Sequence, residues 1–439
     1  MSDILSIIGM IAALAALSFM VMKGVNIFIA AIVSSLIVAV TGGIPLYEAL
    51  QTNYMGGFTG FFGGNFLIFV AGAIMGQVYE KTNGAKAIAR MIINGLGKQA
   101  AIVAVPLAIG ILTYGGIAGF VVCFAVFPIA LEIYREADIP RRFIPGAIVF
   151  ACCTFSAIGP GNPQVGNVVL QNALGTTLMA GAVVGFVATI VTLVVGVFML
   201  TVMVKRAQAA GEHFVAKPTD KFDDDAVCPN GWLALAPLAL TLILINIKVG
   251  GAQIIPTPFG VFLGSVLAYI VLRKYKTDPT PVMDLLANGI RNAVTAAANT
   301  SAVVGFGSVV KAASGFPVLC SAIENIPGPP LVAVALATTI IAGICGSGSG
   351  GLGIAAPILK PIFVDGLGIN INVLHRMMMV ASCGLDSLPH NGFVVTVING
   401  VCGETHKDAY MPVFWLTVVT PLIATAVSIV LFTLFPNLP

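Results

Sequence analysis

Long apolar segments separated by short polar turns extend along nearly the whole chain. Two of them, residues 4–22 and 25–40, approach the roughly 20 residues with which a helix crosses a bilayer. Other continuous apolar segments lie near residues 65–79, 178–204, 232–247, 258–272, 293–310 and 412–435. A glycine-rich stretch at 56–64 predicts a connector before the third span. The pattern predicts an all-α polytopic membrane protein.

Two further apolar segments are too long for one helix and too short for two complete spans. Residues 100–134 are interrupted at 113–116, and residues 331–362 are interrupted by a Gly/Ser run at 346–351. Glycine permits backbone conformations that end a helix. We interpret both segments as re-entrant hairpins whose tips are these interruptions.

Two other spans contain polar residues and proline where a continuous helix is expected. Residues 143–172 are broken at 156–163, and residues 371–402 are broken at 383–391. Non-helical backbone at membrane depth is stable only where protein or a water-filled cavity satisfies its N–H and C=O groups. The breaks therefore predict discontinuous helices that form a binding site near the midplane of the membrane.

The breaks also indicate an internal duplication. Pro160 and Pro389 are separated by the same number of residues as Asn162 and Asn391. Each half is expected to contain five transmembrane spans and one re-entrant hairpin, and the odd number of spans predicts that the two repeats are inverted. The expected organisation is a first inverted repeat at 1–204, a cytoplasmic linker at 205–229 and a second inverted repeat at 230–439.

Composition and charge agree with a membrane protein. The chain has 439 residues, of which 58% are hydrophobic and only 9% are charged, against ~25% charged residues in soluble domains. The net charge of +3 gives no reason to expect a nucleic-acid partner. With the linker in the cytoplasm, most of the 21 Lys and Arg residues fall on that side, as the positive-inside bias requires. The exceptions are Lys248, Lys311, Lys360 and Arg376.

The interruptions supply chemistry suited to a small anion. Half-helix N-termini present free N–H groups and a positive dipole end, and amides and hydroxyls add neutral hydrogen-bonding groups. No Arg or Lys is expected in the middle of a span, which favours one small carboxylate over a dicarboxylate or a phosphate. The candidate substrate-binding residues are Thr113, Tyr114, Gly115, Gly116, Asn162, Gln164, Ser347, Gly348, Ser349, His390 and Asn391.

Asp386 stands out among the 18 carboxylates because it lies in the middle of a membrane-length segment. An intramembrane ionisable residue is by default a candidate functional group. Either Asp386 or His390 could carry a coupling proton, since desolvation favours a neutral carboxyl group and histidine changes charge near neutral pH. Two alternatives stay open: Asp386 caps the next half-helix while His390 is a hydrogen-bonded core residue, and the amides of Asn162, Gln164 and Asn391 only pin the irregular backbone.

Other classes of protein are less well supported. Sodium coupling is the main alternative, because backbone carbonyls at 63–65, 299–301 or the hairpin tips could bind Na⁺. An anion channel could also contain re-entrant hairpins. An enzyme is not expected, since the Gly/Ser run fits a nucleophile elbow poorly and no HExxH motif occurs. The eight cysteines form no metal-binding pattern, and no metal or cofactor is predicted.

The hairpin and break motifs together resemble those of the gluconate permease (GntP) family within the wider ion-transporter superfamily. The motifs are the hairpin from Gly115 to Pro128, the break from Gly159 to Asn167, the tip Gly346-Ser347-Gly348, and Ser387 to Phe393. The resemblance implies a bacterial proton symporter of the cytoplasmic (inner) membrane that imports gluconate, other sugar acids, glycerate, D-serine or 3-hydroxybutyrate. It also implies a homodimer with scaffold and transport domains, contacts with membrane lipid, and an elevator-like movement.

The sequence departs from gluconate carriers at two places. Those carriers have an acidic residue beside the first hairpin tip and a His-Pro-rich first break, whereas this chain has Tyr114-Gly115-Gly116-Ile117 and Gly159-Pro160-Gly161-Asn162-Pro163. A less polar pocket is expected. We therefore favour a short hydroxy or keto monocarboxylate, such as 3-hydroxybutyrate or lactate, over a sugar acid.

Overall fold

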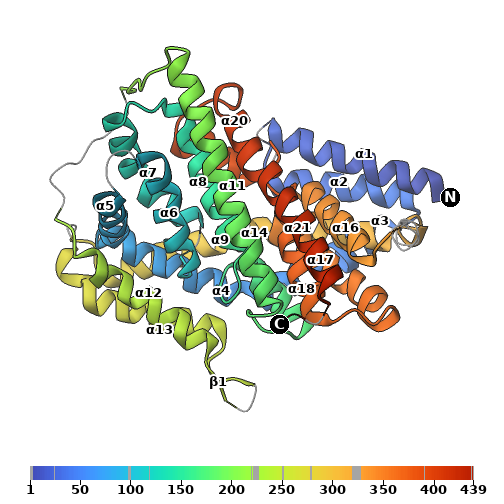
Figure 1. Ribbon diagram of the computed structural model, residues 1–439. Coiled ribbons are helices and arrows are strands. Elements are labelled where there is room, and N and C mark those ends of the chain that lie inside the picture. Colours follow the sequence, from blue (N-terminus) through green and yellow to red (C-terminus); the bar gives the residue numbers. More distant parts are fainter. Residues whose placement is uncertain are drawn as a thin grey trace.

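The fold is almost entirely helical (Figure 1). The computed structural model describes residues 3–23, 25–96, 100–117, 119–218, 220, 227–249, 252–276, 279–318, 328–389, 391–436 and 438. Within them the only strands are β1 (Lys248–Val249) and β2 (Ala252–Gln253), an antiparallel pair in which Lys248 faces Gln253 and Val249 faces Ala252.

The first half of the chain has long helices before and after a hairpin and a broken span. Its α-helices are α1 (Asp3–Met22), α2 (Ile27–Gly42), α3 (Leu46–Glu48), α4 (Met55–Lys81), α5 (Gly84–Leu96), α6 (Ala101–Tyr114), α7 (Gly119–Glu136), α8 (Ile144–Cys153), α9 (Phe155–Ile158), α10 (Val165–Leu174) and α11 (Ala182–Ala209). A π-helical turn, Ala49–Tyr54, joins α3 to α4, and a 3₁₀ turn, Arg141–Phe143, precedes α8.

The second half contains the same kinds of element. Its α-helices are α12 (Gly231–Asn246), α13 (Thr257–Leu272), α14 (Val282–Ala312), α16 (Pro330–Cys345), α17 (Gly348–Lys360), α18 (Ile371–Ser382), α19 (Gly392–Val395), α20 (His406–Phe414) and α21 (Thr420–Leu434). A 3₁₀ turn, Arg273–Tyr275, follows α13, and π-helical segments follow α17 (Pro361–Gly366), α19 (Thr396–Val401) and α20 (Trp415–Val419).

The predicted all-α membrane architecture is confirmed. Six continuous helical segments of the described chain are long and apolar enough to cross a bilayer: Leu46–Lys81, Arg141–Ile158, Ala182–Ala209, Thr257–Tyr275, Val282–Ala312 and His406–Leu434. Shorter apolar helices accompany them, of which Ala101–Tyr114 and Pro330–Gly343 belong to the hairpins and Gly392–Val401 to the second broken span. Both predicted hairpins are present as α6/α7 and α16/α17. The repeat boundaries and their inverted relation remain predictions.

The predicted glycine-rich connector is wrong, because residues 56–64 lie inside α4. In an apolar environment a helix satisfies its backbone hydrogen bonds internally, which outweighs the low helix propensity of glycine. Gly57 also allows α4 to approach α14 closely, since a Cβ there would lie 2.0 Å from Ser308 Oγ. Small residues at helix contacts are typical of membrane proteins.

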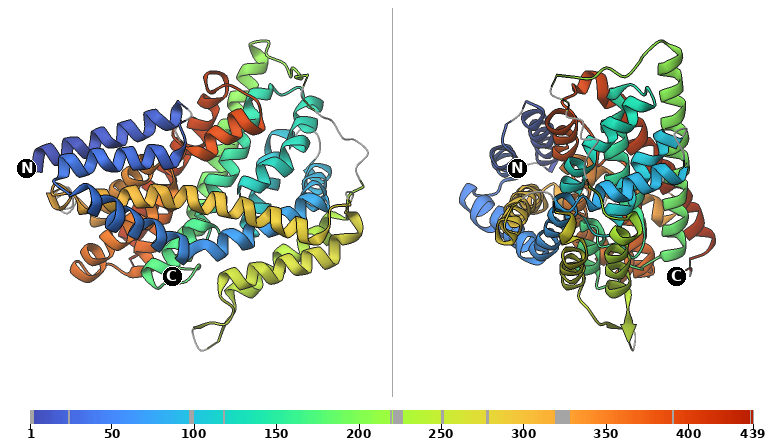
Figure 2. Two further views of the ribbon diagram at one scale, coloured as in Figure 1. Left: turned by 180° about the vertical axis from the view of Figure 1, so that it is seen from behind. Right: turned by 90° about the vertical axis from the view of Figure 1, so that its left-hand side faces the viewer.

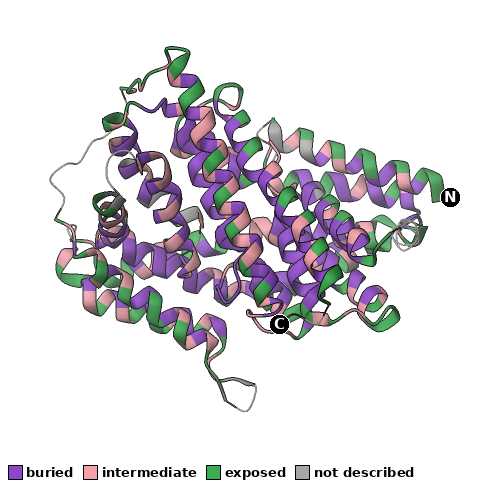
Figure 3. Ribbon diagram, in the orientation of Figure 1, coloured by how far each residue is buried: buried purple, intermediate pink, exposed green. Residues whose placement is uncertain are grey.

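The broken helices occupy the middle of the molecule. Figure 2 shows α1 and α2 as a pair that extends to one side, while α4 and α14 lie along each other through the centre. In Figure 3 the central helices are mainly buried and the outward faces are exposed. On α11, for example, Ile190, Val194 and Phe198 are at least 60% exposed, as expected for a face in contact with lipid.

The start of the linker is held by ion pairs to loops from both halves. Arg141 is almost fully buried, pairs with Asp220 at 2.6 Å and also pairs with Glu404. Arg142 binds Glu212 with two hydrogen bonds, at 2.6 and 2.9 Å. Residues 212–218 and Asp220 are therefore held between the α7–α8 loop and the loop that precedes α20.

Candidate functional site

The first break, between α9 and α10, is organised by Asn162. Its side chain is completely buried. Its Nδ2 donates to the backbone oxygens of Ser156, at 2.7 Å, and Gly159. Its Oδ1 accepts from the backbone N–H of Gln164, at 3.0 Å, and from Asn167 Nδ2, at 2.9 Å. Asn162 therefore satisfies backbone groups that the interrupted helix leaves unpaired.

Arg376 reaches the same break from α18 and is completely buried. Its Nε donates to Ala180 O at 2.9 Å, its Nη2 to Leu178 O at 3.0 Å, and its Nη1 to Ile158 O at 2.7 Å and Asn167 Oδ1 at 3.2 Å. No Arg or Lys is expected in the middle of a span, yet the guanidinium group of Arg376 in α18 lies at the first break. The sequence position of Arg376, near the start of the second broken span, did not reveal that its side chain crosses to the first one.

The second break, between α18 and α19, is centred on Asp386. The carboxylate Oδ1 accepts from the backbone N–H of Gly348 at 2.6 Å and from Asn391 Nδ2 at 3.0 Å. Asn391 Oδ1 accepts from the backbone N–H groups of Phe393, at 2.7 Å, and Val394, at 3.0 Å. Asn391 is thus the cap of the following half-helix, and the alternative in which Asp386 has that role is wrong. His390 lies outside the described residues.

The carboxylate of Asp386 instead sits at the start of α17, the second arm of the second hairpin. Gly346 has a φ of 55°, a left-handed conformation that glycine adopts without strain. The N-cap Ser347 accepts from the backbone N–H of Gly350 at 3.2 Å. Asp386 and Ser347 thereby each accept from an N–H group of the first turn of α17, where a carboxylate is favoured by the helix dipole.

At the first hairpin tip, Thr113 and Tyr114 are tied to the first break. The Thr113 hydroxyl bonds Ser156 Oγ at 2.9 Å, and the Tyr114 hydroxyl donates to Pro160 O. Ser156 Oγ also accepts from Gln164 Nε2 at 3.3 Å. Tip and break therefore form one hydrogen-bonded unit.

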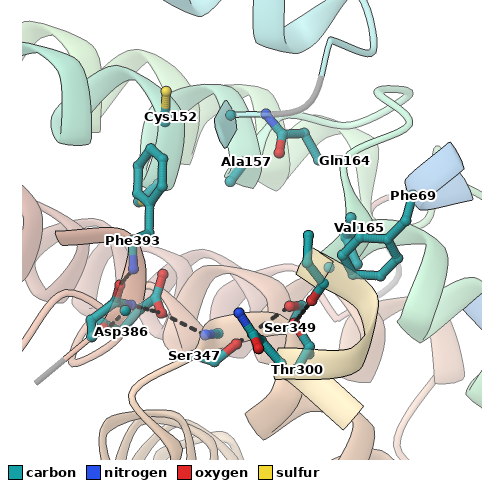
Figure 4. A pocket seen from close by; sticks show the side chains of 18 of the residues that line it. Phe69, Cys152, Ala157, Gln164, Val165, Thr300, Ser347, Ser349, Asp386 and Phe393 are labelled. Carbon is teal, nitrogen blue, oxygen red and sulfur yellow. Dashed lines mark hydrogen bonds between the residues drawn. The ribbon is translucent and has the colours of Figure 1, made fainter. Parts of the chain in front are cut away.

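A cavity of about 330 Å³ lies between the hairpins and the breaks (Figure 4). Gln164 and Ala157 of the first break face Ser347, Ser349 and Asp386 across it. Eight of the residues predicted from the sequence line this cavity: Thr113, Gly116, Gln164, Ser347, Gly348, Ser349, Asp386 and Asn391. The other three with described positions, Tyr114, Gly115 and Asn162, are not part of its wall.

The central helix α14 contributes a polar wall that the sequence analysis did not assign to substrate. Asn292, Asn299 and Thr300 line the cavity. Of these, only Asn299 and Thr300 belong to the stretch 299–301 whose carbonyls were candidates for sodium binding. The sequence around Asn292 did not identify it as a site residue, because a lone amide in a long span cannot be distinguished from a packing residue. Asn65 of the other stretch considered for sodium donates to Phe61 O at 3.0 Å and does not line the cavity.

The geometry of the cavity suits a small anion. The N-termini of α10, α17 and α19 all contribute lining residues, so three positive dipole ends meet there. Asp386 is the only charged side chain among the described residues that line it. Phe69, Val165 and Phe393 supply apolar surface. No group of His, Cys, Asp and Glu in the described chain could hold a metal ion.

Comparisons with known proteins agree on one family. The model of the GntP family permeases matches residues 5–435. The uncharacterized transporter YxjC of Bacillus subtilis (strain 168) is 32% identical over 415 residues, which cover 86% of this chain and 87% of that protein. The high-affinity gluconate transporter of Escherichia coli (strain K12) is 23% identical over 303 residues, 65% of each chain.

A solved structure shows the same fold at a lower level of identity. The YdaH transporter of Alcanivorax borkumensis, described as having an unusual topology, aligns with a TM-score of 0.57 and 15% identity over 90% of both chains. The sequence relatives are transporters and permeases rather than enzymes, in agreement with the expectation from the sequence. Taken with the central cavity and the paired hairpins, the match over residues 5–435 shows that this chain is a multi-pass membrane transporter of the GntP permease family.

Proposed function

We propose that the protein is a secondary active transporter that carries a small organic carboxylate together with a proton. The observation that carries this proposal is the position of Asp386, a carboxylate that lines the cavity and binds the first N–H group of α17. A substrate carboxylate would seek the same positive end of the helix. Two anions in one small cavity repel each other, so a proton on Asp386 favours substrate binding.

This arrangement couples the binding of the substrate to the binding of the proton. Protonated Asp386 is neutral and binds the Gly348 N–H group less strongly. The substrate carboxylate can then approach this N–H group. When the substrate leaves, the empty helix end again favours the ionised form of Asp386, and the proton departs. Linked binding of this kind is reciprocal, since the proton raises substrate affinity by the same factor as the substrate raises proton affinity.

The volume and lining of the cavity favour a short hydroxy or keto monocarboxylate, such as 3-hydroxybutyrate or lactate, as the substrate. Its volume lies at the small end of the ~300–1,000 Å³ range of ligand pockets. Ser349, Thr300 and Gln164 could bind a hydroxyl or keto oxygen, while Phe69 and Phe393 suit a short alkyl chain. Because two relatives are described as a gluconate transporter and a gluconate permease, a gluconate-type sugar acid is the second substrate class.

The hairpins and broken helices would move together as a transport domain in an elevator-like movement of a homodimer in the bacterial inner membrane. The bonds that join Thr113 to Ser156 and Asp386 to Gly348 support this, since each ties a hairpin to a break. Sodium coupling is the alternative, with Asn299 and Thr300 in the cavity as its candidate ligands. An anion channel is the second alternative, and it would let its substrate equilibrate across the membrane without concentrating it.

Uptake by proteoliposomes tests the proposal. Labelled 3-hydroxybutyrate, lactate and gluconate are offered separately, with an inward proton gradient and without sodium. Accumulation above equilibrium that a protonophore abolishes is expected. Accumulation that needs a sodium gradient instead would replace the proton as coupling ion, and flux that only equilibrates would indicate a channel.

A further inference from the structure

Arg376 is among the largest fully buried side chains in the described chain. Charged side chains are almost never fully buried unless an opposite charge accompanies them. Arg376 has four hydrogen bonds, and its acceptors are three backbone carbonyls and the amide oxygen of Asn167. All four acceptors are neutral. Among the described residues, the positive charge is therefore solvated by dipoles and paired with no anion.

The fold makes room for this side chain. A Cβ at Gly185 of α11 would lie 2.9 Å from both Cδ and Nε of Arg376, and a Cβ at Gly181 would lie 2.6 Å from its Cβ. A larger residue at Gly185 would displace the guanidinium end of Arg376, and one at Gly181 would displace the base of its side chain. The charge is thus held in one place by a close approach of α11 to α18.

That place is directly behind one wall of the cavity. Two acceptors of Arg376, Ile158 O and Asn167 Oδ1, each belong to the neighbour of a lining residue, Ala157 and Gly166 respectively. In Figure 4 this wall carries Ala157, Gln164 and Val165, and Asp386 lies on the facing side. The cavity consequently has a fixed cation behind one wall and a carboxylate on the other.

We propose that Arg376 is a positioning residue that supplies a fixed positive charge behind the cavity wall and so makes the cavity selective for anions. This inference rests on the proposed function, in which the substrate is a carboxylate. The field of Arg376 adds to the dipole of α10, because its partner Asn167 lies in the first turn of that helix. A cation in the low-dielectric interior acts over about 10 Å with little screening. A purely structural Arg376 would pin the break without affecting the sign of the ligand.

Cavity cysteines allow the charge to be measured without knowledge of the substrate. Cys153 is partly exposed and lines the cavity. A full-length chain with Cys153 as its only cysteine, and with Asp386→Asn to remove the competing charge, is treated with two methanethiosulfonates. One reagent is the anionic 2-sulfonatoethyl compound and the other the cationic 2-(trimethylammonium)ethyl compound. The ratio of their reaction rates at Cys153 reports the local potential.

Four variants separate charge from structure. Arg376→Gln removes the charge. Asn167→Asp leaves Arg376 in place but puts a carboxylate beside its Nη1. Both variants should lower the anionic-to-cationic rate ratio on the order of tenfold. Arg376→Lys keeps the charge and should hold the ratio within about twofold of its parent. Arg291→Gln, at an exposed position of α14, is the matched control and should leave the ratio unchanged.

The outcomes distinguish this inference from the proposed function. A ratio that is the same in the parent, in monodisperse Arg376→Gln and in Asn167→Asp would overturn the role of the charge. Equal losses in Arg376→Lys and Arg376→Gln would overturn it too, because the hydrogen-bonded fork and not the charge would then matter. If the ratio falls as expected but wild-type proteoliposomes take up none of the three carboxylates, the positive cavity stands and carboxylate symport fails.

Discussion

The carboxylate of Asp386 accepts a hydrogen bond of 2.6 Å from the backbone N–H of Gly348, and this contact joins the second break to the second hairpin. The two residues are far apart in the sequence, yet each lies at an interruption of an apolar segment. A carboxylate at a helix N-terminus is electrostatically favoured. The same helix end is where we propose that an anionic substrate binds, so the ionised Asp386 and the substrate carboxylate would compete for one N–H group.

Replacing Asp386 with Asn should uncouple transport from the proton gradient. An amide cannot change charge, so accumulation driven by a pH gradient is expected to disappear, while exchange of labelled for unlabelled substrate continues. Both activities are measured in proteoliposomes. Asp284→Asn, at an exposed position in the first turn of α14, serves as the control. A variant of Asp386 that still concentrates substrate normally would remove this residue from coupling.

Gly348→Ala should disturb the same contact sterically. A Cβ at this position would lie 3.3 Å from Asp386 Cγ and 3.4 Å from Oδ2, so the carboxylate must shift by a few tenths of an ångström. We expect a raised KM and an altered pH dependence of uptake. Gly64→Ala is a matched control, because nothing lies within 4 Å of its added carbon. Identical kinetics in both variants would show that the Gly348 contact is not part of the site.

Asn162 and Asn391 occupy equivalent positions in the two breaks but should respond differently to alanine. Asn162→Ala leaves buried backbone groups without partners, at a cost of about 1–3 kcal/mol for each group, and should lower Tm strongly. Asn391→Ala removes a helix cap, which costs about 1 kcal/mol, and one bond to Asp386. The KM for the carboxylate should therefore rise more for Asn391→Ala, and the Tm should fall more for Asn162→Ala. The reverse order would mean that Asn162 contacts the substrate.

This pair of asparagines also shows how far the sequence could go. Glycine, proline and amides in an apolar segment are conspicuous, so both hairpins, both breaks and eight residues of the cavity wall could be predicted. Which amide pins the backbone and which faces the cavity could not, because Asn162 and Asn391 occupy the same kind of local sequence. The difference lies in what their local partners contact: Asn167, the partner of Asn162, binds the buried Arg376, whereas Asp386, the partner of Asn391, binds Gly348 of the second hairpin.

Arg376 and the glycines of α4 were missed for related reasons. The hydrogen bonds of Arg376 all lead to residues 158–180, more than 190 positions earlier in the chain, and no local pattern announces such a partner. The glycines of α4 have low helix propensity, but the apolar surroundings favour a helix, and at Gly57 the close contact with α14 also requires a small residue. In both cases packing between distant helices overrides the local signal.

The two arginines that hold the linker should contribute very different amounts to stability. Arg141 and Asp220 are 6% and 2% exposed, whereas Arg142 and Glu212 are 32% and 40% exposed. Removing one partner of a buried ion pair costs about 3–5 kcal/mol, and an exposed pair contributes about 0–1 kcal/mol. Arg141→Gln should thus lower Tm clearly more than Arg142→Gln. Equal shifts would show that Asp220 and Glu404 find other partners.

The contact between Asp138 and the linker should loosen in acid. The backbone N–H of Phe214, at 2.9 Å, and the ring of His213, at 2.6 Å, bind this carboxylate and hold its pKa below the usual range. A pKa lower in the folded protein than in the unfolded chain means that the contact stabilises the fold above a pH of about 3.9. The stabilisation is lost as the pH falls from there through the folded pKa. Hydrogen exchange at the Phe214 amide, measured relative to Asp138→Asn, should be slower in the parent at neutral pH and equal to the variant near the acid limit. Equal exchange at neutral pH would show that Asp138 does not hold the linker.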